Sequence, residues 1–329
     1  MLRFLIRRVL SAILIIAIVS VVTFFLFFAV PGDPARLSCG KLCNAARLAE
    51  IKHNMGLDKP LIVQYGEYMK GIVAGREVSE GGDPRPCDMP CFGYSFTTHQ
   101  PVWETIVDRV PATASLALGA SVLFLVFGTG LGVMSALNKG KALDKAGIAL
   151  ALTGASVQIY FIGVVARAVF VDNLRWLPQP GYTPLTEDPG KWFSGLLLPW
   201  LTLAFVSSAV YARLSRSAMI EAMQEDFVRT GRARGLSRRS IYVKHAGRAA
   251  ISPVVTVFGL DLAGLLGGAI ITETVFSIQG IGRLAINSVT NADLPMIMAT
   301  VLLAAVAIVI ANVIVDVAYA FIDPRVRIA

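Results

Sequence analysis

The chain contains few charged residues and few of the side chains that usually carry out chemistry. Charged residues make up 16% of its 329 positions, whereas an average soluble protein has about 25%. It has three histidines and four cysteines, and His53, His99 and His245 are too scattered to match the spacing of metal ligands. These absences argue against a soluble enzyme, and we expect no metal site built on histidine.

A phosphate-binding loop is also missing from the sequence. The pattern Gly-x4-Gly-Lys-Ser/Thr fails at Gly140-Lys141, because Ala142 stands where a hydroxyl is needed and no glycine lies five positions earlier. Gly128, Gly130 and Gly132 resemble a dinucleotide loop, but they lie inside an apolar run that favours close helix packing. We therefore expect no catalytic residue and no cofactor in this chain.

Long apolar runs dominate what is present. Hydrophobic residues make up 55% of the chain, and its mean hydropathy is +0.65. Six runs approach the roughly 20 residues that cross the hydrocarbon core of a membrane. They are Val9–Val30, Thr113–Leu137, Gly147–Val171, Gly195–Ala212, Ile251–Phe276 and Met296–Phe321. The pattern predicts an all-α membrane protein with six transmembrane helices.

Positive charge gathers beside these runs. The formal net charge is +8, but few aromatic residues are interleaved with the basic ones, which argues against nucleic acid binding. The positive-inside rule assigns the basic clusters, and with them both termini, to the cytoplasm. The clusters are Arg3, Arg7 and Arg8, then Lys139, Lys141 and Lys145, then an arginine-rich segment after the fourth run, and finally Arg325 and Arg327. The first run lacks an Ala-x-Ala-like cleavage site, so we expect it to remain as a span.

The spans divide the chain into three parts. Residues 1–30 form the cytoplasmic N-terminus and first span, residues 31–112 an extracytoplasmic region, and residues 113–329 a core of five spans. Within the middle part we expect short helices at Ala45–Met55 and Leu61–Val73, followed by a loop at Gly75–Pro90.

All four cysteines lie in the extracytoplasmic region. They are Cys39, Cys43, Cys87 and Cys91. In an oxidising compartment they predict two disulfides, for which three pairings are possible. The alternative is a metal or cluster site made of four thiolates.

The segment Arg213–Arg248, within a cytoplasmic stretch at 213–250, separates two apolar runs with a basic helical sequence. Its basic residues (Arg213, Arg216, Arg229, Arg232, Arg234, Arg238, Arg239, Lys244 and Arg248) outnumber its acidic ones (Glu221, Glu225 and Asp226). Asp226 is expected to cap a helix that Gly235 ends with a left-handed residue, and Ser237 to cap the next helix. The pattern indicates a docking surface for another protein, unless these charges only set the orientation of the chain.

Four ionisable residues lie within the apolar runs. Arg167 and Glu273 stand near the outer ends of their spans, where they either extend towards water or line an outer vestibule. Asp261 is deeper and flanked by small residues. It either faces a polar pathway and meets the ammonium group of a substrate, pairs with a second subunit, or makes a structural hydrogen bond. Asp316 is the fourth.

Taken together, the short motifs along the chain resemble those of one family, the B-type permease subunit of ABC importers for dipeptides and oligopeptides. The motifs are Pro31-Gly32-Asp33-Pro34, Gly56-Leu57-Asp58-Lys59-Pro60, Gly93-Tyr94-Ser95-Phe96, Arg109-Val110-Pro111-Ala112-Thr113, Asp226-Phe227-Val228-Arg229-Thr230, Ala233-Arg234-Gly235-Leu236, Glu273-Thr274-Val275-Phe276 and Asp323-Pro324-Arg325. Their order and spacing cover nearly the whole chain.

The resemblance implies a type I importer fold in a bacterial inner membrane, with a coupling segment that inserts into an ATPase subunit. The residues of that segment are Asp226, Arg229, Thr230, Arg232, Ala233, Arg234, Gly235, Leu236 and Ser237. Arg229-Thr230-Gly231 occupies the Glu-Ala-Ala positions of the general family motif, so only its glycine, Gly235, is retained.

The same resemblance implies a set of partners. They are a second, homologous permease, two ATPase subunits that hold ATP and magnesium, an extracytoplasmic binding protein, a peptide substrate and membrane lipid. Candidate pathway residues are Asp261, Glu273 and Arg167. The alternatives are an importer of nickel, haem or glutathione, a secondary transporter that uses Asp261, Glu273 and Asp316 as ion sites, and a membrane-anchored structural or signalling protein.

Overall fold

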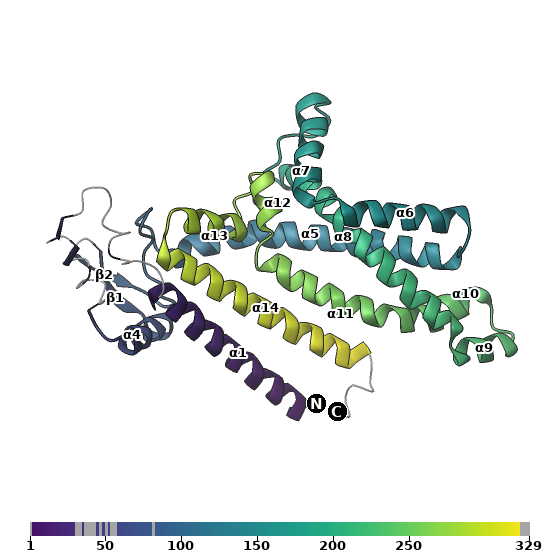
Figure 1. Cartoon of the computed structure of the whole chain (residues 1–329), viewed down its shortest axis with the longest axis horizontal. Coiled ribbons are helices and arrows are strands. Elements are labelled where there is room, and N and C mark those ends of the chain that lie inside the picture. Colours follow the sequence, from purple (N-terminus) through teal and green to yellow (C-terminus); the bar gives the residue numbers. More distant parts are fainter. Residues whose placement is uncertain are drawn as a thin grey trace.

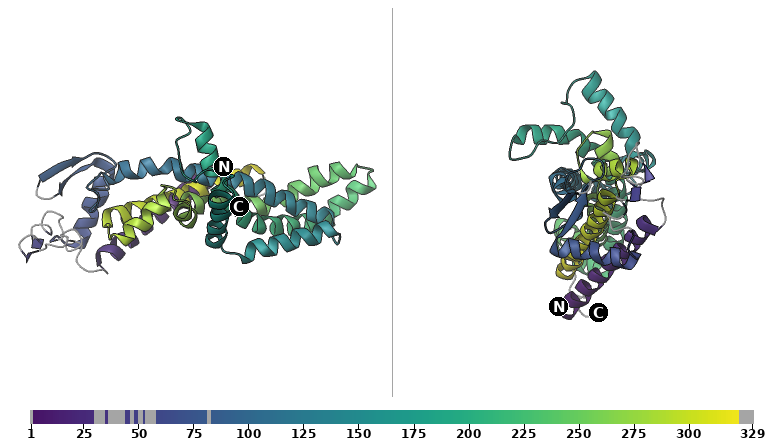
Figure 2. Two further views of the ribbon diagram at one scale, coloured as in Figure 1. Left: turned by 90° about the horizontal axis from the view of Figure 1, so that it is seen from above. Right: turned by 90° about the vertical axis from the view of Figure 1, so that its left-hand side faces the viewer.

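The fold is an elongated bundle of long helices with a small cap at one end. The computed structural model describes residues 2–29, 35, 44–45, 48–49, 52, 58–80 and 83–322. The cap contains α4 (Leu61–Ala74), β1 (Arg76–Glu80) and β2 (Asp83–Cys87). At the opposite end of the long axis lie α9 (Asp226–Ala233) and α10 (Arg238–Ser240), as the two orthogonal views agree (Figures 1 and 2).

Five helical stretches in the described part of the chain are long and apolar enough to cross a membrane. They are Ile6–Leu26 of α1 (Leu2–Ala29), all of α5 (Val102–Leu137), all of α8 (Pro189–Gln224), Ile241–Leu266 formed by η2 (Ile241–Ala246) and α11 (Gly247–Leu266), and Leu294–Ile314 of α14 (Leu294–Ile322). These helices confirm five of the predicted spans, although the ends of several differ.

The third predicted span is bent rather than straight. It consists of α6 (Ala142–Ser156), α7 (Ile159–Arg167) and η1 (Ala168–Asn173), and its two halves meet at 95°. Val157 and Gln158 take extended backbone conformations between the halves, so the helix cannot continue through them. α7 therefore turns away from the line of α6 (Figure 1), and a sixth span exists only if the bent pair is counted as one.

The fifth predicted span, Ile251–Phe276, was wrong at both ends. The helix begins earlier, in η2, and ends at Leu266. Gly268 then adopts a φ of +124°, which an L side chain rarely takes, and the chain turns into α12 (Ile270–Val275) and α13 (Ile281–Thr290). A Cβ at Gly268 would lie 2.7 Å from the Cα of Gly282, so this turn is also tightly packed.

The fourth span is longer than its apolar run. α8 begins with Asp188 as its N-cap, whose carboxylate accepts a hydrogen bond from the Lys191 amide at 3.0 Å. That hydrogen bond lowers the pKa of the Asp188 carboxyl. The helix continues without a break through Arg213–Gln224, where polar and apolar residues are mixed, because most of these residues favour a helix. The arginine-rich segment therefore starts as an extension of a span.

Glycines let α5 and α8 pack closely. A Cβ at Gly128 would lie 2.6 Å from Cβ of Tyr211, and one at Gly132 would lie 2.4 Å from the carbonyl oxygen of Ala212. Gly130, between them, has no described atom within 4 Å of such a Cβ. The interpretation of this glycine run as a helix-packing surface is confirmed for Gly128 and Gly132.

In the cap, one predicted helix is present, but a predicted loop is replaced by two paired strands. The helix predicted at Leu61–Val73 is present as α4, but β1 and β2 pair as antiparallel strands where a loop was expected. Pro84 and Pro86 are compatible with this pairing because each strand of a two-stranded sheet has an outer edge where no amide donor is needed. Cys87 and Cys91 form a disulfide. Cys39, Cys43 and most of the predicted helix Ala45–Met55 lie outside the described residues.

The cap is attached to α1 and α14. Phe24 of α1, Tyr68 of α4 and Met296 of α14 belong to one buried apolar cluster. Asp293, just before α14, is buried and accepts hydrogen bonds from the Phe96 amide at 3.1 Å and the Thr97 hydroxyl at 3.0 Å. The hydroxyl of Ser95 also donates to Asp293. The Gly93-Tyr94-Ser95-Phe96 motif thus fastens the cap to the start of the last helix.

Candidate functional site

The exposed tip formed by α9 and the turn after it is the strongest candidate site. α9 follows α8 after the single residue Glu225, and its buried side carries Val228 and Gly231. Val228 packs into an apolar cluster with Met219 of α8 and Ile241 of η2. One side of the short helix is therefore held by the chain's own core, and the other side is free to meet a partner.

The turn at Gly235 has a defined hydrogen-bond pattern. The Gly235 amide donates to the Arg232 carbonyl at 3.0 Å, and the Leu236 amide donates to the Gly231 carbonyl at 3.1 Å. Gly235 has a φ of +74°. Together these features form a Schellman motif, which satisfies the last carbonyls of α9 and needs a left-handed residue. The predicted role of Gly235 in ending the helix is confirmed.

The two predicted caps have different outcomes. The Ser237 hydroxyl accepts a hydrogen bond from the Ser240 amide at 3.3 Å, which confirms it as the cap of the next helix. Asp226 is not a cap, because it is the first residue of α9 and the cap position is Glu225. An acidic residue in the first turn still favours the helix through its dipole. Asp226 also lies 3.6 Å from Arg229 in an exposed ion pair.

The outer surface of this tip is basic with apolar residues at its edges. We call it the α9 face. It consists of the exposed residues Phe227, Arg229, Thr230, Arg232, Ala233, Arg234, Gly235, Leu236 and Ser237. Phe227 and Leu236 are 42% and 43% exposed, which suits burial against another protein. All the predicted coupling residues except Asp226 belong to the α9 face, and Asp226 lies beside it.

Asp261 lies on α11, and Tyr211 of α8 fixes its side chain. The Tyr211 hydroxyl donates a hydrogen bond to Oδ2 of Asp261 at 2.8 Å, and the tyrosine side chain is fully buried. Asp261 itself is exposed, as are its neighbours Leu260 and Gly264. A carboxylate on the surface of an apolar helix needs a polar pathway or a partner, because exposure to lipid is costly.

Glu273 does not extend towards water, as one interpretation of the sequence had it. It is 0% exposed. Its Oε1 accepts a hydrogen bond from the Thr113 hydroxyl at 2.7 Å, and its Oε2 accepts one from the Arg283 amide at 2.8 Å. Thr113 in turn accepts from the Ile281 amide at 2.8 Å. The carboxylate therefore holds α12 and α13 against α5.

Arg167 and Asp316 complete the predicted ionisable residues. Nη1 of Arg167 donates to the Val275 carbonyl at 3.4 Å, so this side chain joins α7 to the end of α12. The side chain of Asp316 lies outside the described residues. Of the predicted pathway residues, Glu273 belongs to α12 and Arg167 contacts the end of α12, whereas Asp261 lies on α11.

Sequence reasoning missed a buried ion pair between Asp144 and Arg216. Nε and Nη2 of Arg216 donate to the two carboxylate oxygens of Asp144 at 2.7 and 2.9 Å. Asp144 is only 3% exposed. The two residues stand in lysine- and arginine-rich stretches that were interpreted through net charge alone. Asp144 is the single acidic residue among the lysines of residues 139–145, and this was the one feature of the sequence that could have indicated a pairing role.

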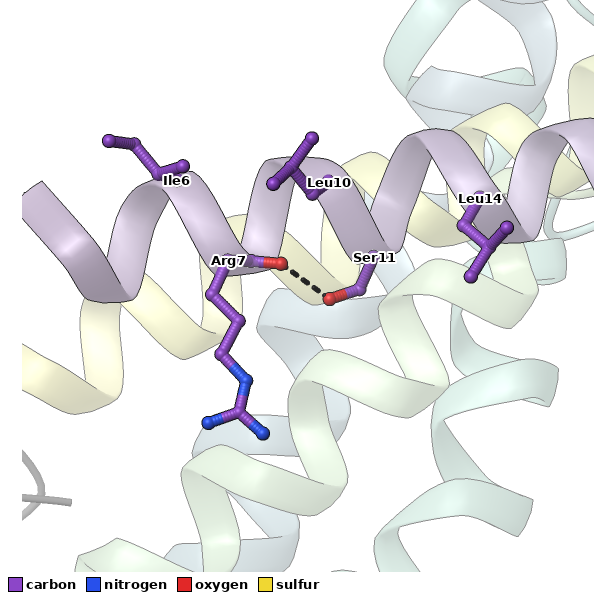
Figure 3. A pocket seen from close by; sticks show the side chains of 5 residues that line it. All are labelled: Ile6, Arg7, Leu10, Ser11 and Leu14. Atoms are coloured by element: carbon purple, nitrogen blue, oxygen red, sulfur yellow. Dashed lines mark hydrogen bonds between the residues drawn. The ribbon is translucent and has the colours of Figure 1, made fainter.

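The described residues include one groove on the surface of α1. This shallow groove is lined by Ile6, Arg7, Leu10, Ser11 and Leu14 (Figure 3). All of these belong to one exposed helix, so the groove is part of the surface that an apolar span offers to lipid. Within the described ranges, no three or more His, Cys, Asp or Glu side chains come together as metal ligands.

Comparison with known proteins identifies the family. Residues 128–328 match the family described as binding-protein-dependent transport system inner membrane component, and residues 1–117 match its N-terminal region. The chain belongs to this family. It is therefore a multi-pass permease component of the inner membrane, of a class that works with ATPase and binding-protein partners.

Several members of the binding-protein-dependent permease family are similar over nearly their whole length. A peptide ABC transporter permease protein of Sinorhizobium fredii is 34% identical over 98% of this chain and 99% of its own. A peptide transport system permease protein of Brucella abortus is 35% identical over 98% of each chain. A glutathione transport system permease protein of Salmonella choleraesuis is 35% identical over 99% of each.

A solved structure supports the permease fold. The inward-facing methionine ABC transporter MetNI matches with a TM-score of 0.53 and 15% sequence identity, over 68% of this chain and 99% of the MetNI chain. At this identity the likeness shows the fold alone. It confirms the predicted all-α ABC importer permease architecture.

Proposed function

We propose that this chain is one of two homologous permease subunits of an ATP-driven peptide importer, and that the α9 face couples it to an ATPase subunit. The observation that carries the proposal is the α9 face itself, which is basic and partly apolar on a helix whose other side is buried. The similar proteins named for peptide and glutathione transport support a peptide substrate, since glutathione is itself a small peptide.

The proposed assembly has four kinds of component. This chain and a second permease each form half of the pathway, two ATPase subunits bind ATP and magnesium, and an extracytoplasmic protein delivers the peptide. This chain itself catalyses no reaction. The α9 face and both termini lie in the cytoplasm and the cap lies outside, because the arginines of the α9 face satisfy the positive-inside rule only in that orientation.

The proposed mechanism is alternating access driven by movement of α9. When ATP closes the ATPase pair, α9 is displaced, and α8 moves with it because only Glu225 separates the two helices. The Schellman turn at Gly235 helps because its hydrogen bonds keep the tip in one conformation. Asp261 lines the pathway, while Glu273 and Arg167 shape its outer end by holding α12 in place.

Changing Gly235 tests this function. In the described structure a Cβ at Gly235 meets no atom within 4 Å, so any cost comes from its φ of +74° alone. A valine in this conformation costs about 1–2 kcal/mol, whereas asparagine tolerates it. We expect Gly235→Val to lower peptide uptake several-fold in the reconstituted assembly while ATP hydrolysis continues, and Gly235→Asn to behave nearly as the wild type.

The measurement compares uptake and ATP hydrolysis in the same proteoliposomes. The proposal requires first that an ATPase subunit co-purifies with the wild-type chain. A wild-type chain that transports without any ATPase would contradict it, and so would a Gly235→Val assembly with normal uptake for each ATP hydrolysed.

A further inference from the structure

The turn between α5 and α6 is closed by one buried carboxylate. Asp144 lies in the first turn of α6, and its Oδ2 accepts a hydrogen bond from the Gly140 amide at 2.8 Å. Its Oδ1 accepts one from the Ser135 hydroxyl at 2.5 Å. Because Ser135 belongs to α5, Asp144 holds the end of one helix to the start of the next.

Arg216 attaches this turn to α8. Its guanidinium meets Asp144 with two parallel hydrogen bonds, and its Nε also lies 3.2 Å from the Ser135 hydroxyl. The side chain of Asp144 is 5% exposed, and that of Arg216 is 25% exposed. A bidentate arginine–carboxylate pair has one preferred geometry, and burial protects it from screening by salt. It therefore holds the three helices in a defined register.

Residues next to this pair on α5 and α8 pack in the apolar cluster that also holds α9. Met219 and Ala222, within two turns of Arg216 on α8, belong to the apolar cluster that also contains Val228 of α9. Ala136, the residue after Ser135, belongs to the same cluster. The apolar cluster thus joins α5, α8 and α9, and the ion pair beside it joins α8 to α6 and, through Ser135, to α5. Apolar contacts have no preferred direction, so the ion pair adds to them a contact with one defined geometry.

We propose that Asp144 and Arg216 are positioning residues that pass the displacement of α9 from α8 to α5 and α6. This inference rests on the proposed coupling function of α9. Without the pair, α8 moves while the α5–α6 turn lags behind, so ATP is hydrolysed with less transport. The pair touches neither substrate nor ATP, and its effect appears in the ratio of the two activities.

The experiment measures uptake and ATP hydrolysis of the complete assembly in proteoliposomes, with trialanine and glutathione as probes. The variants are Arg216→Gln, Asp144→Asn and the double variant. Arg216→Lys is included because it keeps the positive charge and is the gentlest change to folding, but it removes the fork geometry. Lys191→Gln is the matched control, since it removes a positive charge from the exposed opposite end of the same helix.

We expect Arg216→Gln to lower uptake per ATP about tenfold, within the range of coupling between distant sites. Arg216→Lys should lie between this value and the wild type, and Lys191→Gln should equal the wild type. The double variant should resemble each single one, because residues that act as a pair are not additive.

Two results would overturn the inference. One is an unchanged uptake per ATP in both Arg216 variants, including the case in which both activities fall by the same factor through poorer assembly. The other is a strictly multiplicative loss in the double variant. The proposed function fails in a different way, through a wild-type assembly that does not couple uptake to ATP at all.

Discussion

Gly132 marks a position where α5 and α8 approach so closely that no side chain fits. Its missing Cβ would meet the Ala212 carbonyl at 2.4 Å and the Ser215 Cβ at 2.8 Å. The carbonyl is backbone and cannot move without shifting the helix. Gly130, two residues away on the same helix, faces open space in the described structure. Substituting alanine at Gly130 and at Gly132 therefore compares two positions of one helix that differ mainly in how closely α8 approaches them.

We expect Gly132→Ala to destabilise the protein by about 1–3 kcal/mol, the usual cost of overpacking. Gly130→Ala should be neutral or should stabilise it by up to about 1 kcal/mol, because alanine is the better helix former. The unfolding temperature of each detergent-purified variant is measured by heating samples and monitoring the folded fraction by size-exclusion chromatography. Equal midpoints for the two variants would show that α5 and α8 are not packed through Gly132.

At the scale of elements, α12 and α13 depend on polar contacts to α5 because they are short. α12 has 6 residues and α13 has 10, and helices of this length are not stable alone in water. Glu273 and Thr113 supply their attachment with three hydrogen bonds. Gly280 makes room for the carboxylate, since a Cβ there would lie 2.4 Å from Cδ of Glu273.

Replacing Thr113 with valine tests this attachment. The change keeps the shape of the side chain but leaves the Ile281 amide without its acceptor and Glu273 without one donor. The expected loss is about 1–3 kcal/mol for each buried group left unpaired. Thr105→Val is the control, because that hydroxyl bonds only to Pro101 next to its own helix. If thermal unfolding shifts equally in both variants, the proposed attachment is wrong.

At the scale of the whole molecule, the proposed assembly makes the chain half of a pathway, and we expect its exposed polar groups within the spans to meet the other half. Asp261 is the clearest of these, because its carboxylate is exposed on a membrane span while the buried Tyr211 orients it. In the assembly it meets either the ammonium group of the peptide or a residue of the second permease. A substrate that lacks the ammonium group separates these two roles.

We expect Asp261→Asn to reduce trialanine uptake about tenfold, since it removes a charged partner from a site of low polarity. N-acetyl-trialanine should enter the wild type poorly and be unaffected by the variant. Glu187→Gln, in the loop before α8, serves as the control. Equal losses for both peptides would indicate contact with the second permease, and normal trialanine uptake would remove Asp261 from the pathway.

Much of this protein could be predicted from local patterns. Five spans follow from hydropathy because a membrane demands long apolar helices whatever their neighbours are. The turn at Gly235 was also predictable, since a left-handed residue after a basic helix end is a local requirement. The span ends were less accurate, because α8 continues through residues such as Arg216 and Glu221 that are compatible with a helix but not apolar.

The remaining features depend on contacts between distant residues. Arg216 and Asp144 are 72 positions apart, and Thr113 and Glu273 are 160 apart, so no spacing rule connects them. The exposed side of Asp261 and its hydrogen bond from Tyr211 also follow from how the helices pack. Hydropathy and turn chemistry act within a few residues and therefore specify the helices, whereas the partners of buried charges are chosen only when the helices come together.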